Sequence, residues 1–171
     1  MKRTVLILLS ILALVSIVAI ACIISSPAKL PVERTSVASE TATTYKEGIQ
    51  LTIELDKSSY PAGESLNVTL RVTNRRDTPI TLIFGSAQIF DFEIGSVDQS
   101  FSYRWSSHKA FAQVITEIKL EPGEFYEREL PVDVNLQPGK YLIEGATARF
   151  VVAESSESLT LKVGPVEILI F

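Results

Sequence analysis

An alternation of apolar and polar residues with a period of two is the feature of this sequence that most restricts its fold. It is clearest over residues 88–94, where Phe90, Phe92 and Ile94 fall at every second position. Such a period is that of a β-strand with one buried face and one solvated face. Because aromatic side chains bury the largest area per residue, we expect the aromatic-rich segment 80–113 to supply the centre of the core.

The same period recurs along the chain, interrupted by turn signals at intervals of about 8–12 residues. One such signal is Pro61 with Gly63, where proline fixes φ and glycine can take a positive φ. Short alternating strands at this spacing, with no helical period after residue 24, favour an all-β immunoglobulin-like antiparallel β-sandwich. We expect its strands at residues 51–56, 66–74, 80–84, 88–94, 101–105, 111–120, 125–130, 141–150, 159–163 and 166–171.

The first 24 residues are typical of an export signal or a membrane anchor. Lys2 and Arg3 precede an uncharged run, residues 5–24, that is about as long as a bilayer core requires. Positive charges in front of such a run keep the N-terminus in the cytoplasm and place the rest of the chain outside. The segment therefore predicts a domain on the extracytoplasmic side of the cell membrane.

Three fates of this segment remain open. The first is an uncleaved single-pass transmembrane anchor. The second is a lipoprotein signal cut before Cys22, since the residues before it resemble a lipobox, although Ala19 stands where a branched residue is usual. The third is a signal peptide cleaved around residues 25–28 with release of the domain. All three place the domain outside the cytoplasm.

Residues 25–48 differ in composition from the strands that come after them. They are rich in Ser, Thr, Ala and Pro and contain few large apolar side chains. Such a stretch cannot bury enough surface to offset the entropy lost when it is ordered. The sequence therefore predicts a mobile tether over 25–48 and a β-sandwich domain over 49–171, which is long enough to bury its own core.

Composition excludes most chemistry. The net charge is −4 and the basic residues are scattered among acidic ones, so nothing attracts nucleic acid. A single cysteine and a single histidine, His108, exclude a disulfide framework and most metal sites. Asp91 and Glu93 share a strand face, but a calcium ion takes about six or more oxygens, usually gathered in a loop. No glycine-rich phosphate loop is present. We expect neither an enzyme nor a cofactor or metal, and His108 as a solvated turn residue.

One modification signal lies in the second expected strand. Asn67, Val68 and Thr69 form an acceptor sequon for N-linked sugar, which is relevant to an exported domain. Because its neighbours Leu66 and Val68 are expected to point inward, Asn67 should point away from the core. Asn67 is therefore a candidate glycosylation site.

Trp105 and Arg104 allow two interpretations. In the first, Trp105 is a core residue, and Arg104 points outward and pairs across strands with Asp91 or Glu93. In the second, both contact a ligand near one end of the sandwich, because Trp and Arg are favoured in binding hot spots. The alternation of residues 101–105 favours the first interpretation.

Five motifs follow one another at fixed intervals, at residues 85–92, 103–106, 111–113, 120–124 and 138–141. Their order resembles the BsuPI family, the intracellular proteinase inhibitor domain of bacilli and its relatives, over roughly residues 51–150. Because this chain has an export segment, the word "intracellular" in that name does not carry over to it. Within these motifs the resemblance implies a structural role for Gln88, Asp91, Phe92, Arg104, Trp105 and Phe111.

The resemblance also implies that the domain binds, and blocks, an extracellular serine protease. Tight inhibitors of this kind present a rigid, extended loop to the protease cleft. By its chemistry the candidate loop contains Arg75, Arg76 and Asp77, because two arginines suit a protease with an acidic specificity pocket. The turn 61–63 is the second choice. The alternative function is a structural or adhesive cell-surface module that binds a surface protein or a glycan without inhibition.

Overall fold

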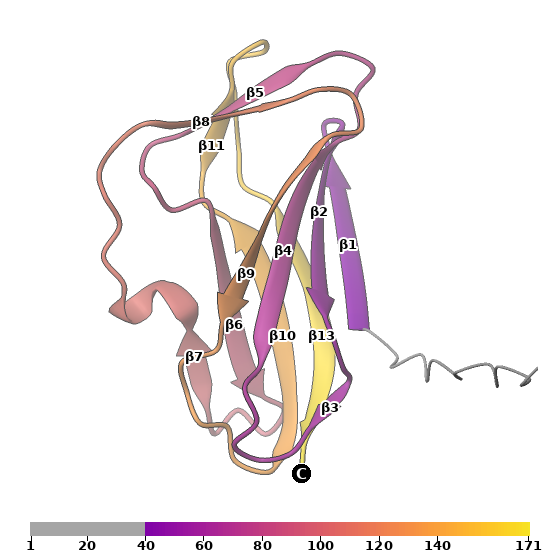
Figure 1. The fold of residues 1–171 in the computed structure, drawn as a ribbon, viewed down its shortest axis with the longest axis vertical. Coiled ribbons are helices and arrows are strands. Elements are labelled where there is room, and N and C mark those ends of the chain that lie inside the picture. The colour runs from indigo at the N-terminus through magenta and orange to yellow at the C-terminus, as the bar shows by residue number, and fades with distance from the viewer. Residues whose placement is uncertain (1–39) are drawn as a thin grey trace, which may run out of the picture. The chain divides into compact units, whose positions relative to one another are not determined.

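The computed structural model describes residues 40–171, which form an all-β sandwich (Figure 1). Thirteen strands and one short 3₁₀ helix, η1 (Trp105–His108), make up this part of the chain. The predicted segment 1–24, with Cys22, and residues 25–39 of the predicted tether lie outside the described residues. Between residues 40 and 171 no helix is long and apolar enough to cross a membrane.

The first sheet is antiparallel, with the strand order β1-β2-β4-β9. In β2 every second side chain from Ile49 to Leu55 is buried, and those between are partly exposed. The two-residue period of the sequence is therefore the alternation between the inner and outer faces of this sheet. Its strands are β1 (Glu40–Lys46), β2 (Ile49–Leu55), β4 (Asn67–Asn74) and β9 (Phe125–Pro131).

The second sheet packs against the inner face of the first, with contacts of β13 to β1 and β2 (Figure 1). Its order is β3-β13-β10-β6-β7, and every pair is antiparallel except β3 with β13. β7 is an edge strand of this sheet, with β6 as its one strand partner in the described residues. The strands are β3 (Ser59–Tyr60), β13 (Lys162–Ile170), β10 (Gly139–Thr147), β6 (Phe90–Ser96) and β7 (Ser102–Arg104).

A third sheet continues the sandwich at one end, where β5, β8 and β11 lie together in Figure 1. Its order is β12-β11-β5-β8. Asn74 lies at the junction of this sheet with the first and is fully buried. Its side chain donates hydrogen bonds to the carbonyls of Thr78 and Leu120 and accepts one from the Arg76 N–H. The strands are β12 (Glu157–Leu159), β11 (Phe150–Val152), β5 (Ile80–Phe84) and β8 (Thr116–Leu120).

The core lies between the first two sheets and extends under the third, which confirms the predicted all-β sandwich. Phe84, Phe90 and Phe92 are buried, as the period of the central segment predicts. Trp105 and Phe111 are only half-buried, because they come after edge strand β7. The centre of the core is therefore supplied by the first half of the segment 80–113, together with apolar residues of β2, β4, β10 and β13.

The structure has residues 40–48 in a strand and a turn, where the sequence predicted a tether. β1 pairs with β2 along its whole length, from Glu40 opposite Leu55 to Lys46 opposite Ile49. Glu47 and Gly48 both have positive φ, 52° and 75°, which is the backbone of a tight hairpin turn. Polar residues fill β1 because one of its faces is solvated and an edge strand needs few buried side chains.

Five predicted strands differ from those observed, and two of them, expected over 159–163 and 166–171, are the short strand β12 and the single continuous strand β13. The strand expected over 111–120 begins only at Thr116, and residues 109–115 have no regular secondary structure. The strand expected over 141–150 is two strands, β10 and β11, which belong to different sheets. Trp105 belongs to η1 rather than to the strand before it. In these last three cases the chain leaves one sheet at an interruption that the local alternation does not mark.

Candidate functional site: the 109–115 loop

Residues 109–115 form a long connection between η1 and β8 along one side of the molecule (Figure 1). We call this segment the 109–115 loop. Near its end the side chains of Val114 and Ile115 are 54% and 73% exposed. Exposed apolar side chains that adjoin one another are candidate contacts for a partner. The affinity that these two side chains can provide to a partner depends on how firmly the rest of the loop is held.

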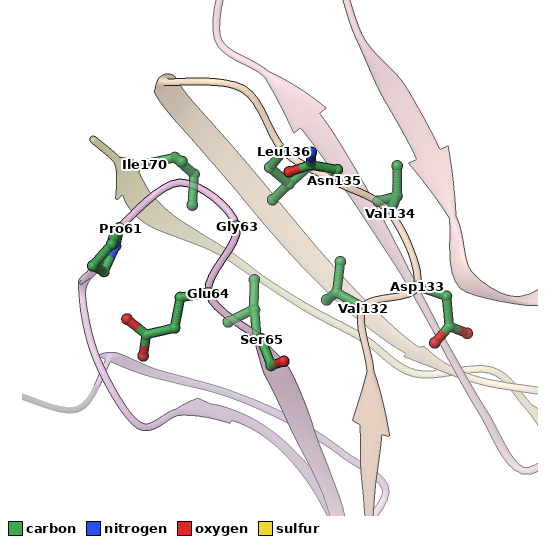
Figure 2. A pocket seen from close by; sticks show the side chains of 11 residues that line it. Pro61, Gly63, Glu64, Ser65, Val132, Asp133, Val134, Asn135, Leu136 and Ile170 are labelled. Carbon is green, nitrogen blue, oxygen red and sulfur yellow. The ribbon is translucent and has the colours of Figure 1, made fainter.

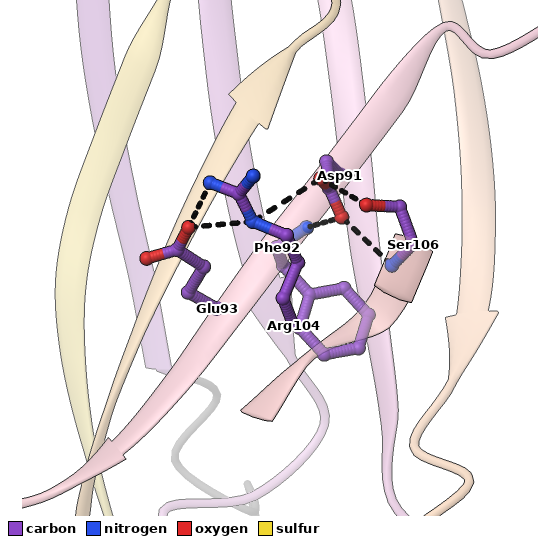
Figure 3. Close-up of polar contacts among 5 residues, drawn as sticks. All are labelled: Asp91, Phe92, Glu93, Arg104 and Ser106. Carbon is purple, nitrogen blue, oxygen red and sulfur yellow. Dashed lines mark hydrogen bonds and ion pairs between the residues drawn. The ribbon is translucent and has the colours of Figure 1, made fainter. Parts of the chain in front are cut away.

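A partly buried carboxylate fixes the corner where the loop begins (Figure 3). Asp91 lies on β6, and its side chain is only 15% exposed. Its carboxylate accepts hydrogen bonds from the Ser106 N–H at 3.1 Å and from the Ser106 hydroxyl at 2.7 Å. It also accepts one from the Phe92 N–H at 2.9 Å. A carboxylate with three donors is well satisfied, so it ties η1 firmly to β6.

An ion pair closes the same corner on its solvent side (Figure 3). Arg104 and Glu93 face each other across β7 and β6, and the Arg104 Nε donates to Glu93 Oε1 at 2.7 Å. The Arg104 Nε also lies 3.8 Å from a carboxylate oxygen of Asp91. Hydrogen bonding to Glu93, and then its charge, raise the pKa of Arg104. The cross-strand pairing predicted for Arg104 is therefore confirmed.

Aromatic side chains connect the first half of the loop to the core. The Trp105 ring packs between Phe92, at a centroid distance of 6.2 Å, and Phe111, at 5.9 Å. The Lys109 ammonium lies 4.7 Å from the centre of the Trp105 ring and pairs with Asp133 at 2.5 Å. Such contacts stabilise a loop whose backbone lacks a strand partner. Trp105 is thus a supporting residue of the loop.

Hydrogen bonds hold the middle of the loop. The Ala87 N–H donates to the carbonyl of Ala112 at 2.9 Å, and the Gln113 amide group donates to the carbonyl of Phe111 at 3.2 Å. Beyond Ala112, no backbone hydrogen bond other than those of the β8 ladder joins residues 113–115 to another part of the described chain. The loop is therefore supported at its base and its middle, and it leaves the side chains of Val114 and Ile115 exposed. Of its last backbone groups, the Val114 carbonyl accepts a hydrogen bond from the Thr116 hydroxyl at 3.5 Å.

The loop predicted from sequence, with Arg75, Arg76 and Asp77, lies at the junction of the first and third sheets. Arg75 Nε donates to the side chain of Gln50 at 2.5 Å, and Arg76 Nε donates to the carbonyl of Glu47 at 2.8 Å. Both guanidinium groups therefore contact the β1–β2 hairpin. Asp77 is exposed. The structure does not bring this loop and the 109–115 loop into one site.

The remaining predicted residues are found on the surface or in supporting positions. His108 is exposed in η1, and Asn67 is exposed at the start of β4, as predicted. The Asn67 side chain donates to Glu129 at 2.5 Å. Gln88 is half-buried just before β6, in the segment that contacts the middle of the 109–115 loop.

A separate candidate region is a hollow of about 340 Å³ between the turn after β3 and the segment after β9 (Figure 2). Its charged lining residues are Glu64 and Asp133, and these already pair with Lys57 and Lys109. Across residues 40–171 no group of three His, Cys, Asp or Glu side chains could hold a metal ion. The hollow thus offers shape but no unpaired charge for selecting an ionic ligand.

Sequence reasoning missed the 109–115 loop because it extended the next strand backward over it. Residues 110–115 are Ala-Phe-Ala-Gln-Val-Ile, in which positions 110, 112 and 114 are all apolar and only Gln113 interrupts the other alternate set. This pattern suits a strand with a buried face, so it gives no local signal of the loop.

The fold and this loop define a class: a small β-sandwich that presents a supported, exposed loop and has no metal cluster in its described part. The family model "Intracellular proteinase inhibitor", BsuPI, matches residues 53–150. The chain belongs to this family, as the five motifs predicted. Membership supports a proteinase-inhibitor-like function with a protease as partner, and it favours a non-catalytic protein.

Solved structures with a similar course of the chain share 14% sequence identity with it. A structural genomics target, SoR45, has a TM-score of 0.42 over 80% of this chain and 88% of its own. The C-terminal domain of wzt has 0.42 over 77% and 78%, and the putative ApaA protein from Bordetella pertussis has 0.39 over 78% and 90%. No curated protein matches the sequence. The family match is therefore the comparison that bears on function.

Proposed function

We propose that this chain is a membrane-tethered inhibitor that binds a serine protease outside the cytoplasm and is not itself an enzyme. Family membership supports a protease as the partner. The observation that carries the proposal is the 109–115 loop, which is exposed at Val114 and Ile115 and supported from below by Trp105. A loop of this kind can enter the substrate cleft of a protease.

The support under the loop matters for affinity. A flexible loop loses conformational freedom when it binds, and that loss opposes association. In this chain Asp91 fixes the corner, Trp105 supports Phe111, and Ala87 holds Ala112 before any partner arrives. Much of the ordering therefore precedes binding. The same supports would keep the two ends of a cut loop close together, which opposes release of cleaved product.

The extracytoplasmic location rests on the N-terminal sequence. Lys2 and Arg3 in front of the uncharged run 5–24 favour translocation of the chain beyond it. A tethered inhibitor would act on proteases at the cell surface. Cys22 and the run around it would serve as the anchor if the segment stays uncleaved or is lipidated. Fusing a reporter enzyme after Phe171 and testing which compartment it reports on measures this directly.

The decisive experiment for inhibition titrates the full chain, purified in mild detergent, against a panel of serine proteases that includes subtilisin-like, elastase-like, chymotrypsin-like and trypsin-like enzymes. We expect stoichiometric, slowly dissociating inhibition of at least one member. An Arg75→Ala/Arg76→Ala variant tests the loop predicted from sequence, and retained inhibition would remove that loop from consideration. Hydrolysis of the chain, or no effect on any protease, would contradict inhibition and favour the adhesive cell-surface module.

A further inference from the structure

We infer that residues 113–115, the end of the 109–115 loop, enter the protease cleft, and that the target protease has an apolar primary pocket of small or medium size. This inference rests on the proposed function and adds the contact residues and the specificity of the partner. It is based on the exposure of these residues, their lack of charge and the hydrogen bonding of their backbone.

The end of the loop is apolar and uncharged. Residues 110–116 contain no charged side chain, and the flanking charges are Lys109 and Glu117. The Lys109 ammonium is already paired with Asp133 and packed on the Trp105 ring. What the loop presents to a partner is therefore Val114 and Ile115, without a nearby unpaired cation.

This chemistry selects among protease pockets. A pocket with a carboxylate at its base requires Lys or Arg, whereas an apolar slot or a small apolar pocket takes aliphatic side chains. Ile115, at 73% exposed, is the most exposed large apolar residue in the described part of the chain. The arginines that could suit an acidic pocket, Arg75 and Arg76, are hydrogen-bonded to the β1–β2 hairpin. The geometry therefore favours an apolar pocket.

The backbone of the same residues is suited to a cleft. Proteins often capture an extended segment by pairing with its backbone while pockets receive its side chains. The backbone bonds of the loop end at Ala112, and the β8 ladder begins at Thr116. Residues 113–115 lie between these two fixed points. They are held at both ends and can still present their N–H groups to a partner strand, while the Val114 carbonyl accepts a hydrogen bond from the Thr116 hydroxyl.

The test is a transfer of specificity. The variants Val114→Lys and Ile115→Lys, each in the full chain, are titrated against elastase, subtilisin, chymotrypsin and trypsin beside the unchanged chain. We expect at least one lysine variant to lose about 30-fold or more in affinity for the protease that the unchanged chain inhibits. We expect the same variant to gain inhibition of trypsin, because lysine suits its acidic pocket.

A matched control is Val97→Lys, which places the same charge on an exposed valine in the turn after β6, outside the loop. It should leave inhibition unchanged. Both loop side chains are exposed, so the variants should keep the circular dichroism and melting temperature of the unchanged chain. If the unchanged chain inhibits a protease and both loop variants inhibit it equally well, the inference is wrong and the proposed function stands. If neither the unchanged chain nor any variant inhibits a protease, both the inference and the proposed function are wrong.

Discussion

Ser106 donates two hydrogen bonds to Asp91, from its backbone N–H at 3.1 Å and from its hydroxyl at 2.7 Å. Through them a single carboxylate on a central strand determines where η1 begins and where the 109–115 loop leaves the sandwich. The family resemblance marked Asp91 as a structural residue, and the structure gives the physical reason. The stability of the corner and the presentation of the loop are therefore linked, which makes them testable together.

Asp91→Ala should lower the free energy of unfolding by about 1–3 kcal/mol, because the N–H groups of Ser106 and Phe92 lose their acceptor in a half-buried place. Urea denaturation measures this. Glu93→Ala is the matched control on the same strand. Its carboxylate is exposed and pairs only at the surface, so about 0–1 kcal/mol is expected. Equal losses in the two variants would contradict the role given to Asp91.

Trp105→Ala should destabilise the chain by about 2–3 kcal/mol, less than a fully buried ring, and should speed hydrogen exchange of the Ala87 N–H, which donates to the carbonyl of Ala112 in the loop. Trp105→Phe should keep most of the stability and the slow exchange. The indole N–H is buried without a hydrogen-bond partner in the described part of the chain, so its loss removes no bond. Fast exchange in the Phe variant would show that the ring contacts do not support the loop.

Asn74→Ala should cost roughly 2–3 kcal/mol, since the carbonyls of Thr78 and Leu120 and the N–H of Arg76 would be left without their partner in a buried site. Thermal and urea unfolding both report this. Asn67→Ala is the control at an exposed asparagine, where a change within about 0.5 kcal/mol is expected. A tolerated Asn74 substitution would mean that the junction between the first and third sheets is held by other contacts.

Gly145→Ala should destabilise by about 1–3 kcal/mol through overpacking. An added Cβ would meet Leu70 and would lie 3.1 Å from Val163, both in the core between the sheets. Gly85→Ala is the control, because nothing lies within 4 Å of its added Cβ. Calorimetric melting of the two variants separates a packing effect from a general effect of glycine replacement. A Gly145 variant as stable as the Gly85 variant would contradict the close packing.

The loss of folding stability at acidic pH should depend in part on Asp98. The hydroxyl of Ser96, and then the hydroxyl and N–H of Ser100, lower the pKa of Asp98 from 3.8 to about 2. A lowered pKa in the folded state adds stability above pH ~4, which is lost as pH falls toward 2. The unchanged chain should therefore be more stable than Asp98→Asn at pH 6, with the difference shrinking below pH 4. An NMR titration of the carboxyl group that gives an unshifted pKa would refute this.

Most strands can be predicted from the alternation of the sequence because a two-residue period has one structural solution when one face is buried. β5 was predicted with its observed bounds, and β2, β4 and β9 within two residues at either end. The turn at Gly63, with φ of 83°, also reflects local chemistry. The hairpin turn at Glu47 and Gly48 was not predicted, because β1 carries mostly polar side chains and resembles a tether.

The candidate site can be predicted from the sequence only in part. The motifs indicated the family and placed Asp91, Arg104 and Trp105 in structural roles, and local alternation indicated that Arg104 pairs with Asp91 or Glu93, of which Glu93 is the direct partner. Local alternation could not indicate that the chain leaves the second sheet after Arg104 and reaches the third only at Thr116. Nor could it show that Arg75 and Arg76 would find partners on the β1–β2 hairpin.

The sequence by itself determined the all-β class, the family and the inner faces of β2, β4 and β6, because these depend on the order of residues along the chain. The tertiary structure decided which sheet each strand joins and which loop remains exposed. That assignment depends on contacts between distant residues, such as Ser106 with Asp91 and Lys109 with Asp133. Such contacts arise only when the sheets pack, so no local period can encode the position of the 109–115 loop.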